Sequence, residues 1–134
     1  MNKLSGTIEK IENEDDLTLI YIQVYDDKFT SIIIDNSEIS ELKPGNKVNI
    51  VFKETEVSIG KNLSGGLSIR NRMKAKVKNL LKGKILTKIL LDYQGNEIVS
   101  LITTNAANEL NLNIGDQVEG LVKTNEISIM KDIK

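Results

Sequence analysis

An internal repeat constrains this chain more than any other feature of its sequence. Residues 42–53 match residues 112–123 position by position, at an offset of 70 residues. Shorter matches at similar offsets extend through most of the chain. Such self-similarity indicates a tandem duplication of a unit of roughly 65 residues. We therefore predict two domains, residues 1–61 and 67–134, joined by a polar linker that contains Gly.

Each copy carries the residue pattern of β-strands. Residues 17–25 and 85–93 are rich in β-branched, aliphatic and aromatic side chains, and a turn follows each of them. The pattern predicts five short strands per copy, with the fifth at 56–59 or 126–130. One helical turn is expected before the fourth strand, with Asn36 or Asn105 as its N-cap. This order favours an all-β fold of two tandem five-stranded OB-like Greek-key barrels, each with a short helical turn.

The size of one copy predicts self-association. A barrel of about 65 residues buries little apolar surface for the entropy that it loses, and usually needs additional stabilisation. The chain contains no Cys, so disulfides cannot supply it. We therefore expect the two copies to pack on each other and the chain to form a homo-oligomer.

The composition excludes most enzymes. The chain contains neither Cys nor His, which rules out thiolate nucleophiles, Cys/His zinc sites, Ser-His-Asp triads and imidazole bases. The acidic pairs at 15–16 and 26–27 fall in expected turns, so we predict that the protein is not an enzyme and has no catalytic residues. No apolar run approaches the ~20 residues of a membrane span, and no signal-peptide core follows Met1. We expect a cytoplasmic protein without membrane contact.

Charge divides the chain into unequal halves. Residues 1–66 hold seven basic and 12 acidic residues, whereas residues 67–134 hold 11 basic and seven acidic ones. Residues 70–88 include eight basic residues and no acidic one. This asymmetry fits either an anion-attracting half or a solvated strand face. Four of the five aromatic residues lie in the acidic half, so basic and stacking groups are not interleaved, and we expect no nucleic-acid partner.

Four motifs of the second copy resemble, in order, those of the Mop domain, the repeat of the molbindins within the Mop/TOBE domain family. Residues 67–77 (LSIRNRMKAKV) resemble its opening S-A-R-N-x-x-x-G-x-V, and residues 98–105 (IVSLITTN) resemble I-T-x-I-I/V-T. Residues 115–118 (GDQV) and 122–127 (VKTNEI) resemble G-D-x-V and I-K-A/S-T/S-E-V. A chain that contains two such domains resembles a di-Mop molbindin.

The resemblance implies a cytoplasmic molybdate- or tungstate-binding protein for storage or homeostasis, assembled as a homotrimer. Molybdate and tungstate are dianions without a proton at neutral pH, so a selective pocket needs donors only, and no protein atom ligates the metal. The resemblance does not separate the two anions, or storage from delivery or sensing. The oxyanion-binding positions that it implies are Ser68, Ile69, Arg70, Thr104, Lys123, Thr124 and, in the first copy, Lys53.

The first copy departs from the family pattern. It lacks the Ser-x-Arg-Asn box, Asp35 stands at the position of Thr104, and Glu54 follows Lys53. Carboxylates repel a dianion. Either the first copy has lost its own site, or Lys53 serves a pocket completed by the box of the second copy. Alternative functions are a scaffold or regulatory subunit that binds no ligand and, with less support, a single-stranded nucleic-acid binder.

Overall fold

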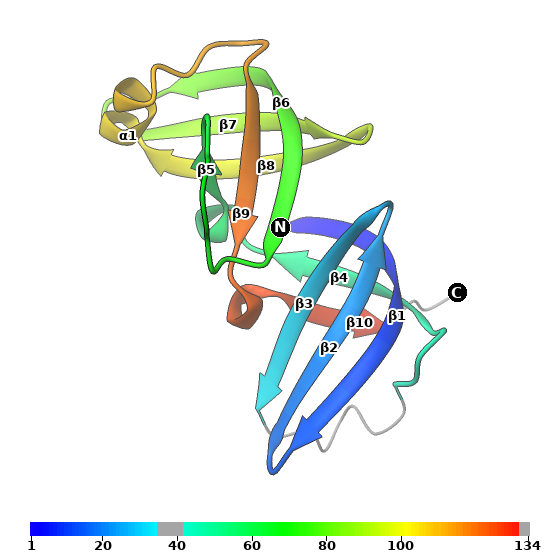
Figure 1. Ribbon diagram of the computed structural model, residues 1–134. Coiled ribbons are helices and arrows are strands. Elements are labelled where there is room, and N and C mark those ends of the chain that lie inside the picture. The colour runs from blue at the N-terminus through cyan, green and yellow to red at the C-terminus, as the bar shows by residue number, and fades with distance from the viewer. Residues whose placement is uncertain (35–41, 132–134) are drawn as a thin grey trace.

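Two five-stranded antiparallel sheets make up the protein, in a computed structural model that describes residues 1–34 and 42–131 (Figure 1). The strand order is β10-β4-β1-β2-β3 in one sheet and β5-β9-β6-β7-β8 in the other. This confirms the predicted all-β fold of two five-stranded units. The strands are β1 (Asn2–Glu14), β2 (Leu17–Val24), β3 (Asp27–Ile34), β4 (Lys47–Phe52), β5 (Ser58–Gly60), β6 (Asn71–Lys82), β7 (Leu86–Tyr93), β8 (Asn96–Thr103), β9 (Gln117–Val122) and β10 (Ser128–Lys131).

Alternating burial explains the strands. In β2 and β7 every second side chain is buried, and the residues between them are exposed or half-buried. The long strands β1 and β6 each contain an irregularity in register, after Ile8 and after Val77. There the amide of Gly45 or Gly115 donates to the carbonyl of that residue, at 2.7 and 2.8 Å. Both glycines have positive φ, which favours Gly at these turns.

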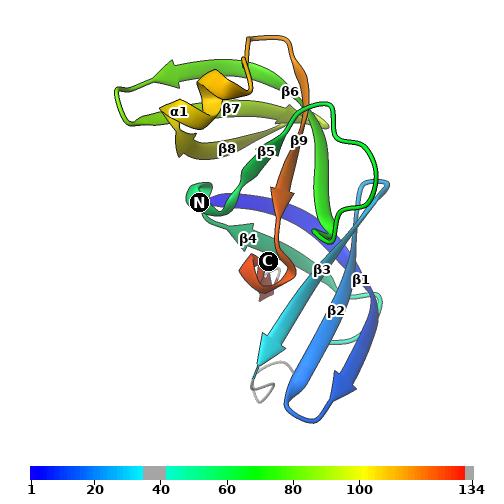
Figure 2. The ribbon, with the colours of Figure 1, turned by 60° about the vertical axis from the view of Figure 1, so that its left-hand side comes forward.

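The fifth strands are exchanged between the two sheets, which corrects the expectation that each stays in its own copy. β5 pairs with β9 (Ser58 opposite Leu121), and β10 pairs with β4 (Ser128 opposite Val51). Figure 2 shows β5 running beside β9. Because the two copies present equivalent sheet edges, the same short strand can complete either sheet.

A lysine that follows β5 fixes the exchanged strand to the second half. Its ammonium group, on Lys61, donates to the carbonyls of Leu110 and Asn111 and to the Asp116 carboxylate, at 3.2, 2.8 and 3.0 Å. A hydrogen bond from the Asn113 amide, followed by the Lys61 bond, lowers the pKa of Asp116 below its ordinary value. The start of the linker is therefore tied to the loop that follows the helix of the second half.

Two equivalent pairs of hydrogen bonds join the halves. The Asn71 side chain accepts from the amide of Thr30 at 2.7 Å and donates to its carbonyl at 3.0 Å. Asn2 makes the same pair of bonds to the backbone of Val99, both at 2.8 Å. The buried side chains of both sheets form one hydrophobic cluster. The halves are thus parts of a single packed body, related by an approximate twofold symmetry.

Two hairpin tips add a contact without a symmetric counterpart. The hydroxyl of the fully buried Tyr93 donates to Asp27, and the Tyr93 ring packs edge-on against Tyr25 at 5.8 Å between centroids. The side-chain amide of Asn96 donates to the Tyr25 hydroxyl. Burial, followed by the Asp27 hydrogen bond, raises the pKa of Tyr93 well above its ordinary value.

The helical elements are short. The helix α1 (Thr104–Glu109) has Thr103 as its N-cap, whose hydroxyl accepts from Ala106, so the expectation of Asn105 is wrong. The expected N-cap Asn36 and the residue Asp35 lie outside the described residues. Two 3₁₀ turns, η2 (Glu54–Glu56) and η3 (Thr124–Glu126), follow β4 and β9. Among the described residues, no helix is long and apolar enough to cross a membrane.

Candidate anion-binding site

The register of β6 and β9 brings two predicted cations together. Asn71, the first residue of β6, lies opposite Val122, the last residue of β9. Arg70 precedes Asn71 and Lys123 follows Val122, so the two cationic residues leave neighbouring antiparallel strands at the same end. Both side chains are exposed. One oxygen of the Glu126 carboxylate accepts from the Lys123 amide at 3.0 Å, so this acidic side chain of the turn is directed toward the backbone.

Hydroxyl groups lie beside this pair of cations. The hydroxyl of Thr124, a predicted site residue, lies 2.8 Å from that of Thr30 on β3. Thr30 is held by the two Asn71 hydrogen bonds, and Asn71 is the neighbour of Arg70. Thr30 is not among the site residues that the motifs imply. One sequence signal for Thr30 lies in the repeat, where this polar residue aligns with the apolar Val99 of the second copy.

Tyr21 extends the cluster on the first sheet. It lies directly opposite Thr30 in the pairing of β2 with β3. Its hydroxyl is hydrogen-bonded to Glu12, which raises the pKa of Tyr21, while the charge of Arg70 lowers it. The Lys10 ammonium lies over the Tyr21 ring, 5.3 Å from its centroid. The surroundings of Arg70 therefore come from the first half of the chain as well as from the second.

The remaining predicted residues divide into two groups. Ser68 and Ile69 belong to the same extended segment as Arg70, with Ser68 exposed and Ile69 half-buried. Thr104 lies elsewhere, at the start of α1, where its hydroxyl donates to the Gly83 carbonyl at 2.8 Å. Lys53 follows β4 in the first half, at the position equivalent to Lys123. Within one chain, five of the seven predicted positions thus share one region.

The equivalent place in the first half has different chemistry. Glu54 occupies the position of Thr124, and Val99 occupies that of Thr30. The amino group of Met1, at the position of Arg70, lies 3.8 Å from the Glu54 carboxylate. A group of hydroxyls and cations in one half thus corresponds to an acid and an apolar side chain in the other.

The Arg70–Lys123 cluster offers the groups that a tetrahedral dianion requires. A guanidinium fork and an ammonium supply charge-assisted hydrogen bonds. Ser68 supplies a further hydroxyl donor, and the Thr30–Thr124 pair supplies one more, because one of these two hydroxyls donates to the other. Removing a dianion from water costs several kcal/mol per charge, so an anion site needs both the charges and the hydrogen bonds. Among residues 1–34 and 42–131, no group of His, Cys, Asp or Glu could hold a metal ion directly.

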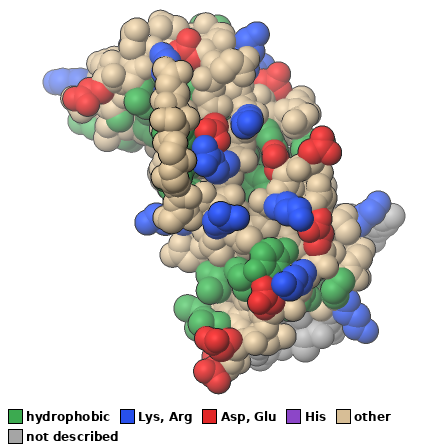
Figure 3. Space-filling view, in the orientation of Figure 1, with side chains coloured by type: hydrophobic (Ala, Val, Ile, Leu, Met, Phe, Trp, Pro, Cys, Tyr) green, Lys and Arg blue, Asp and Glu red, His purple; other side chains and the backbone are tan. Residues whose placement is uncertain are grey.

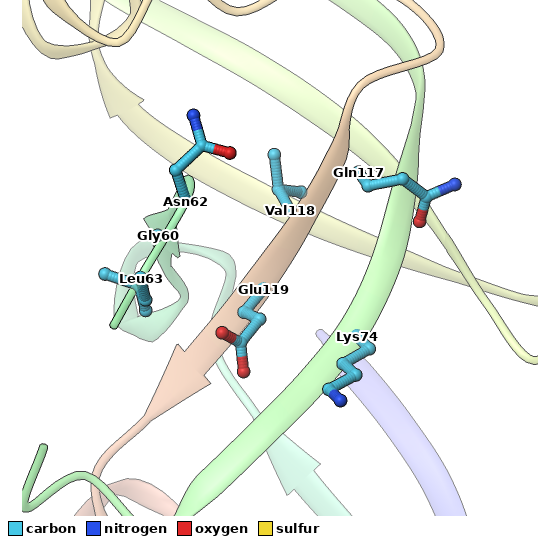
Figure 4. Close-up of a pocket in the computed structure, with 7 residues that line it drawn as sticks. All are labelled: Gly60, Asn62, Leu63, Lys74, Gln117, Val118 and Glu119. Carbon is cyan, nitrogen blue, oxygen red and sulfur yellow. The ribbon is translucent and has the colours of Figure 1, made fainter. Parts of the chain in front are cut away.

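Two hollows elsewhere on the surface are less suited to an anion. One of about 250 Å³ lies between β5, the linker and β9, and is lined in part by Asn62, Lys74, Gln117 and Glu119. Figure 4 shows the amide groups of Asn62 and Gln117 pointing away from each other. The Glu119 carboxylate accepts two hydrogen bonds from Arg72, both at 2.8 Å, and these lower its pKa. The other hollow, of about 440 Å³, contains Lys47 as its single cation among the described residues.

Comparisons with known proteins identify the family. The TOBE domain profile matches residues 67–129. Molybdenum-pterin-binding protein 1 of Clostridium pasteurianum is 32% identical over 65 residues, which are 48% of this chain and 96% of that protein. The chain belongs to the TOBE domain family, as the motif resemblance implied.

Longer matches agree with this assignment. The molybdenum import ATP-binding protein ModC of Brucella abortus is 28% identical over 109 residues, 76% of this chain, but the match spans only 30% of that protein. The crystal structure of the cytoplasmic molybdate-binding protein ModG, with molybdate bound, superposes with a TM-score of 0.91 at 27% identity. That match covers 98% of this chain and 96% of ModG. The two-domain architecture of this chain is therefore shared with ModG over almost its whole length.

Proposed function

We propose that this protein binds molybdate or tungstate and serves the storage or homeostasis of that oxyanion in the cytoplasm. The observation that supports this most is the meeting of Arg70, Lys123 and Thr124 with Thr30 in a chain similar to molybdate-bound ModG. The cytoplasmic location rests on the same likeness to ModG, which is described as cytoplasmic.

The donor set favours an unprotonated dianion over phosphate. Phosphate near neutral pH carries at least one proton, which needs an acceptor in the pocket. The Glu126 carboxylate of the turn is directed toward the Lys123 amide, from which one of its oxygens accepts. Molybdate and tungstate need donors alone, and the cluster supplies cationic groups and hydroxyls. Size and charge are nearly equal in these two anions, so we propose both as ligands.

We propose a homotrimer as the functional assembly. Thr104 lies at the start of α1, away from the region of Arg70 in the same chain. A pocket that combines both residues therefore needs Thr104 from a second molecule, and its hydroxyl would have to leave the Gly83 carbonyl. Light scattering at micromolar concentration should give a mass of about three chains. A monomer with a concentration-independent melting temperature would contradict both the trimer and a shared pocket.

Titration calorimetry with four anions tests the ligand. We expect heat with molybdate and tungstate and none with phosphate or with the smaller dianion sulfate. Heat with phosphate but not with molybdate would overturn the proposal. A stable trimer that binds none of the four would instead support the scaffold function, for which the altered first half is the favouring observation.

A further inference from the structure

Two hairpins at corresponding places of the repeat end in tips of opposite charge. The acidic tip, residues 12–17, joins β1 to β2, and the basic tip, residues 81–88, joins β6 to β7. No basic residue occurs between positions 11 and 27, and no acidic residue between 70 and 91. The charged side chains of the tips are all exposed: Glu12, Glu14, Asp15 and Asp16 in the acidic tip, and Lys82, Lys84 and Lys88 in the basic tip.

Among residues 1–34 and 42–131, most of these charges have no partner of opposite sign. Glu12 pairs with Lys10 at 3.4 Å, but within the described part of the chain no cation pairs with Glu14, Asp15 or Asp16. The Lys82 ammonium donates to the neutral side chain of Asn108 at 2.9 Å. The described residues likewise include no carboxylate paired with a lysine of the basic tip.

Large apolar side chains accompany the charges at both ends. Leu17 of the acidic tip lies opposite Ile34 across β2 and β3, and they are 38% and 74% exposed. In the basic tip Leu81, Ile85 and Leu86 are 53%, 73% and 47% exposed. Contiguous apolar groups rimmed by charge are typical of protein–protein contact surfaces.

The two tips cannot meet within one molecule. Figure 1 shows the β1–β2 hairpin ending at the bottom of the molecule and the β6–β7 hairpin ending beside α1 at the other end. Figure 3 shows acidic and hydrophobic side chains together at the lower end. The helix beside the basic tip contributes a single acidic residue, Glu109. Only a second molecule can bring an acidic tip and a basic tip into contact.

We propose that the acidic tip of one molecule docks against the basic tip of a second copy of this chain. The repeat gives the two hairpins corresponding shapes, so charge decides which arrangement is favourable. Acidic against acidic would gather unpaired carboxylates, whereas acidic against basic pairs them and covers Leu17, Ile34 and Ile85. The contact is head-to-tail, and such contacts close into a ring when the rotation between neighbours permits. The proposal does not depend on anion binding.

Charge reversal tests the docking. One variant carries Glu14→Lys, Asp15→Lys and Asp16→Lys, a second carries Lys84→Glu and Lys88→Glu, and a third combines all five changes. Each of the first two gives both tips the same sign, and we expect the midpoint concentration of association to rise roughly tenfold or more. The combined variant has exchanged charges, so its association should return toward the wild-type value. As a matched control for the second variant, Lys43→Glu with Lys47→Glu changes the net charge by the same amount, away from both tips.

The readouts separate docking from folding. Light scattering and sedimentation over a range of concentrations measure association, and circular dichroism with thermal melting confirms the fold of each variant. Wild-type association should also weaken with added salt, because the tip charges are exposed. A wild-type protein that is monomeric throughout, unchanged association in both single-tip variants, or a combined variant no better than they are would each overturn the proposal. Anion titrations on the same samples report separately on the proposed function.

Discussion

The two halves share one contact geometry and differ in the chemistry beside it. Asn2 and Asn71 make matching hydrogen bonds to the backbone of Val99 and Thr30. Because these bonds involve only the backbone of the partner, they are indifferent to whether its side chain is apolar or a hydroxyl. The hydrogen bonds between the halves can therefore stay the same while the equivalent turns carry a neutral hydroxyl (Thr124) in one half and a carboxylate (Glu54) in the other. Backbone-directed contacts thus let a duplicated fold keep one site and change the other.

Replacing either of the two asparagines should give the largest effect. The two losses of stability show how much each pair of hydrogen bonds between the halves contributes. We expect Asn71→Ala to lower the free energy of unfolding by about 2–5 kcal/mol, because two buried backbone groups of Thr30 lose their partners. Asn2→Ala should cost less, since the Val99 backbone is only partly buried. Urea unfolding monitored by circular dichroism measures both. A larger loss of stability for Asn2→Ala than for Asn71→Ala would contradict this expectation.

Exchanging the turn residues tests the electrostatic difference directly. Thr124→Glu gives the second half the acid of the first, and we expect molybdate affinity to fall by roughly a hundredfold or more through like-charge repulsion. Glu54→Thr makes the reverse change and should leave affinity unchanged or increase it. Calorimetry with molybdate measures both variants, with circular dichroism as the folding control. Equal losses in the two variants would place the anion elsewhere.

Removing one cation of the candidate site should have a smaller effect. Arg70→Ala removes a charge-assisted hydrogen bond, and we expect about 10- to 150-fold weaker molybdate binding with the fold intact. Lys53→Ala distinguishes the two interpretations of the first half. A loss like that of Arg70→Ala would favour a pocket to which Lys53 contributes, whereas unchanged binding would favour a first half without a site. Lys43→Ala is the matched control for removal of a positive charge.

The smallest expected effect concerns the acid stability that one ion pair of the second half provides. Arg72 holds the pKa of Glu119 below its ordinary value of 4.5. The ion pair therefore stabilises the fold above that ordinary value, and this contribution is lost as the pH falls through the lowered pKa. The stability difference between wild type and Arg72→Gln should shrink as the pH is lowered below 4.5. At the equivalent positions the first half has Lys3 and the neutral Asn49, so Lys3→Gln should show no such change.

The strands were predictable because their signal is local. Expected residues 17–25 and 85–93 correspond closely to β2 (Leu17–Val24) and β7 (Leu86–Tyr93), where burial alternates along the strand. The exchange of β5 and β10 was not predictable. Both sheets offer the same kind of edge to a strand of three or four residues, and the sequence of that strand does not distinguish them. The helix N-cap was misplaced by two residues because Thr103 and Asn105 are both acceptable caps.

Only those residues of the candidate site that lie within a motif were predictable. Arg70, Lys123 and Thr124 came from the resemblance, and the register of β6 with β9 places Arg70 and Lys123 at neighbouring strand ends. Thr30 lies 94 positions from Thr124, and no spacing rule connects residues so far apart. Its contact depends on how the two halves pack, which the sequence does not contain in any local form.

The strand exchange has a consequence for how such a protein can diverge. A chain with a single copy of this repeat would have to borrow its fifth strand from a second, identical molecule, and every substitution would then appear on both sides of the pair. Fusing the copies makes the exchange intramolecular, at an effective concentration in about the millimolar range. It also allows a substitution in one copy without the same substitution in the other. Symmetry is no longer enforced by identity, so one side can lose ligand chemistry while still donating the strand on which its neighbour depends.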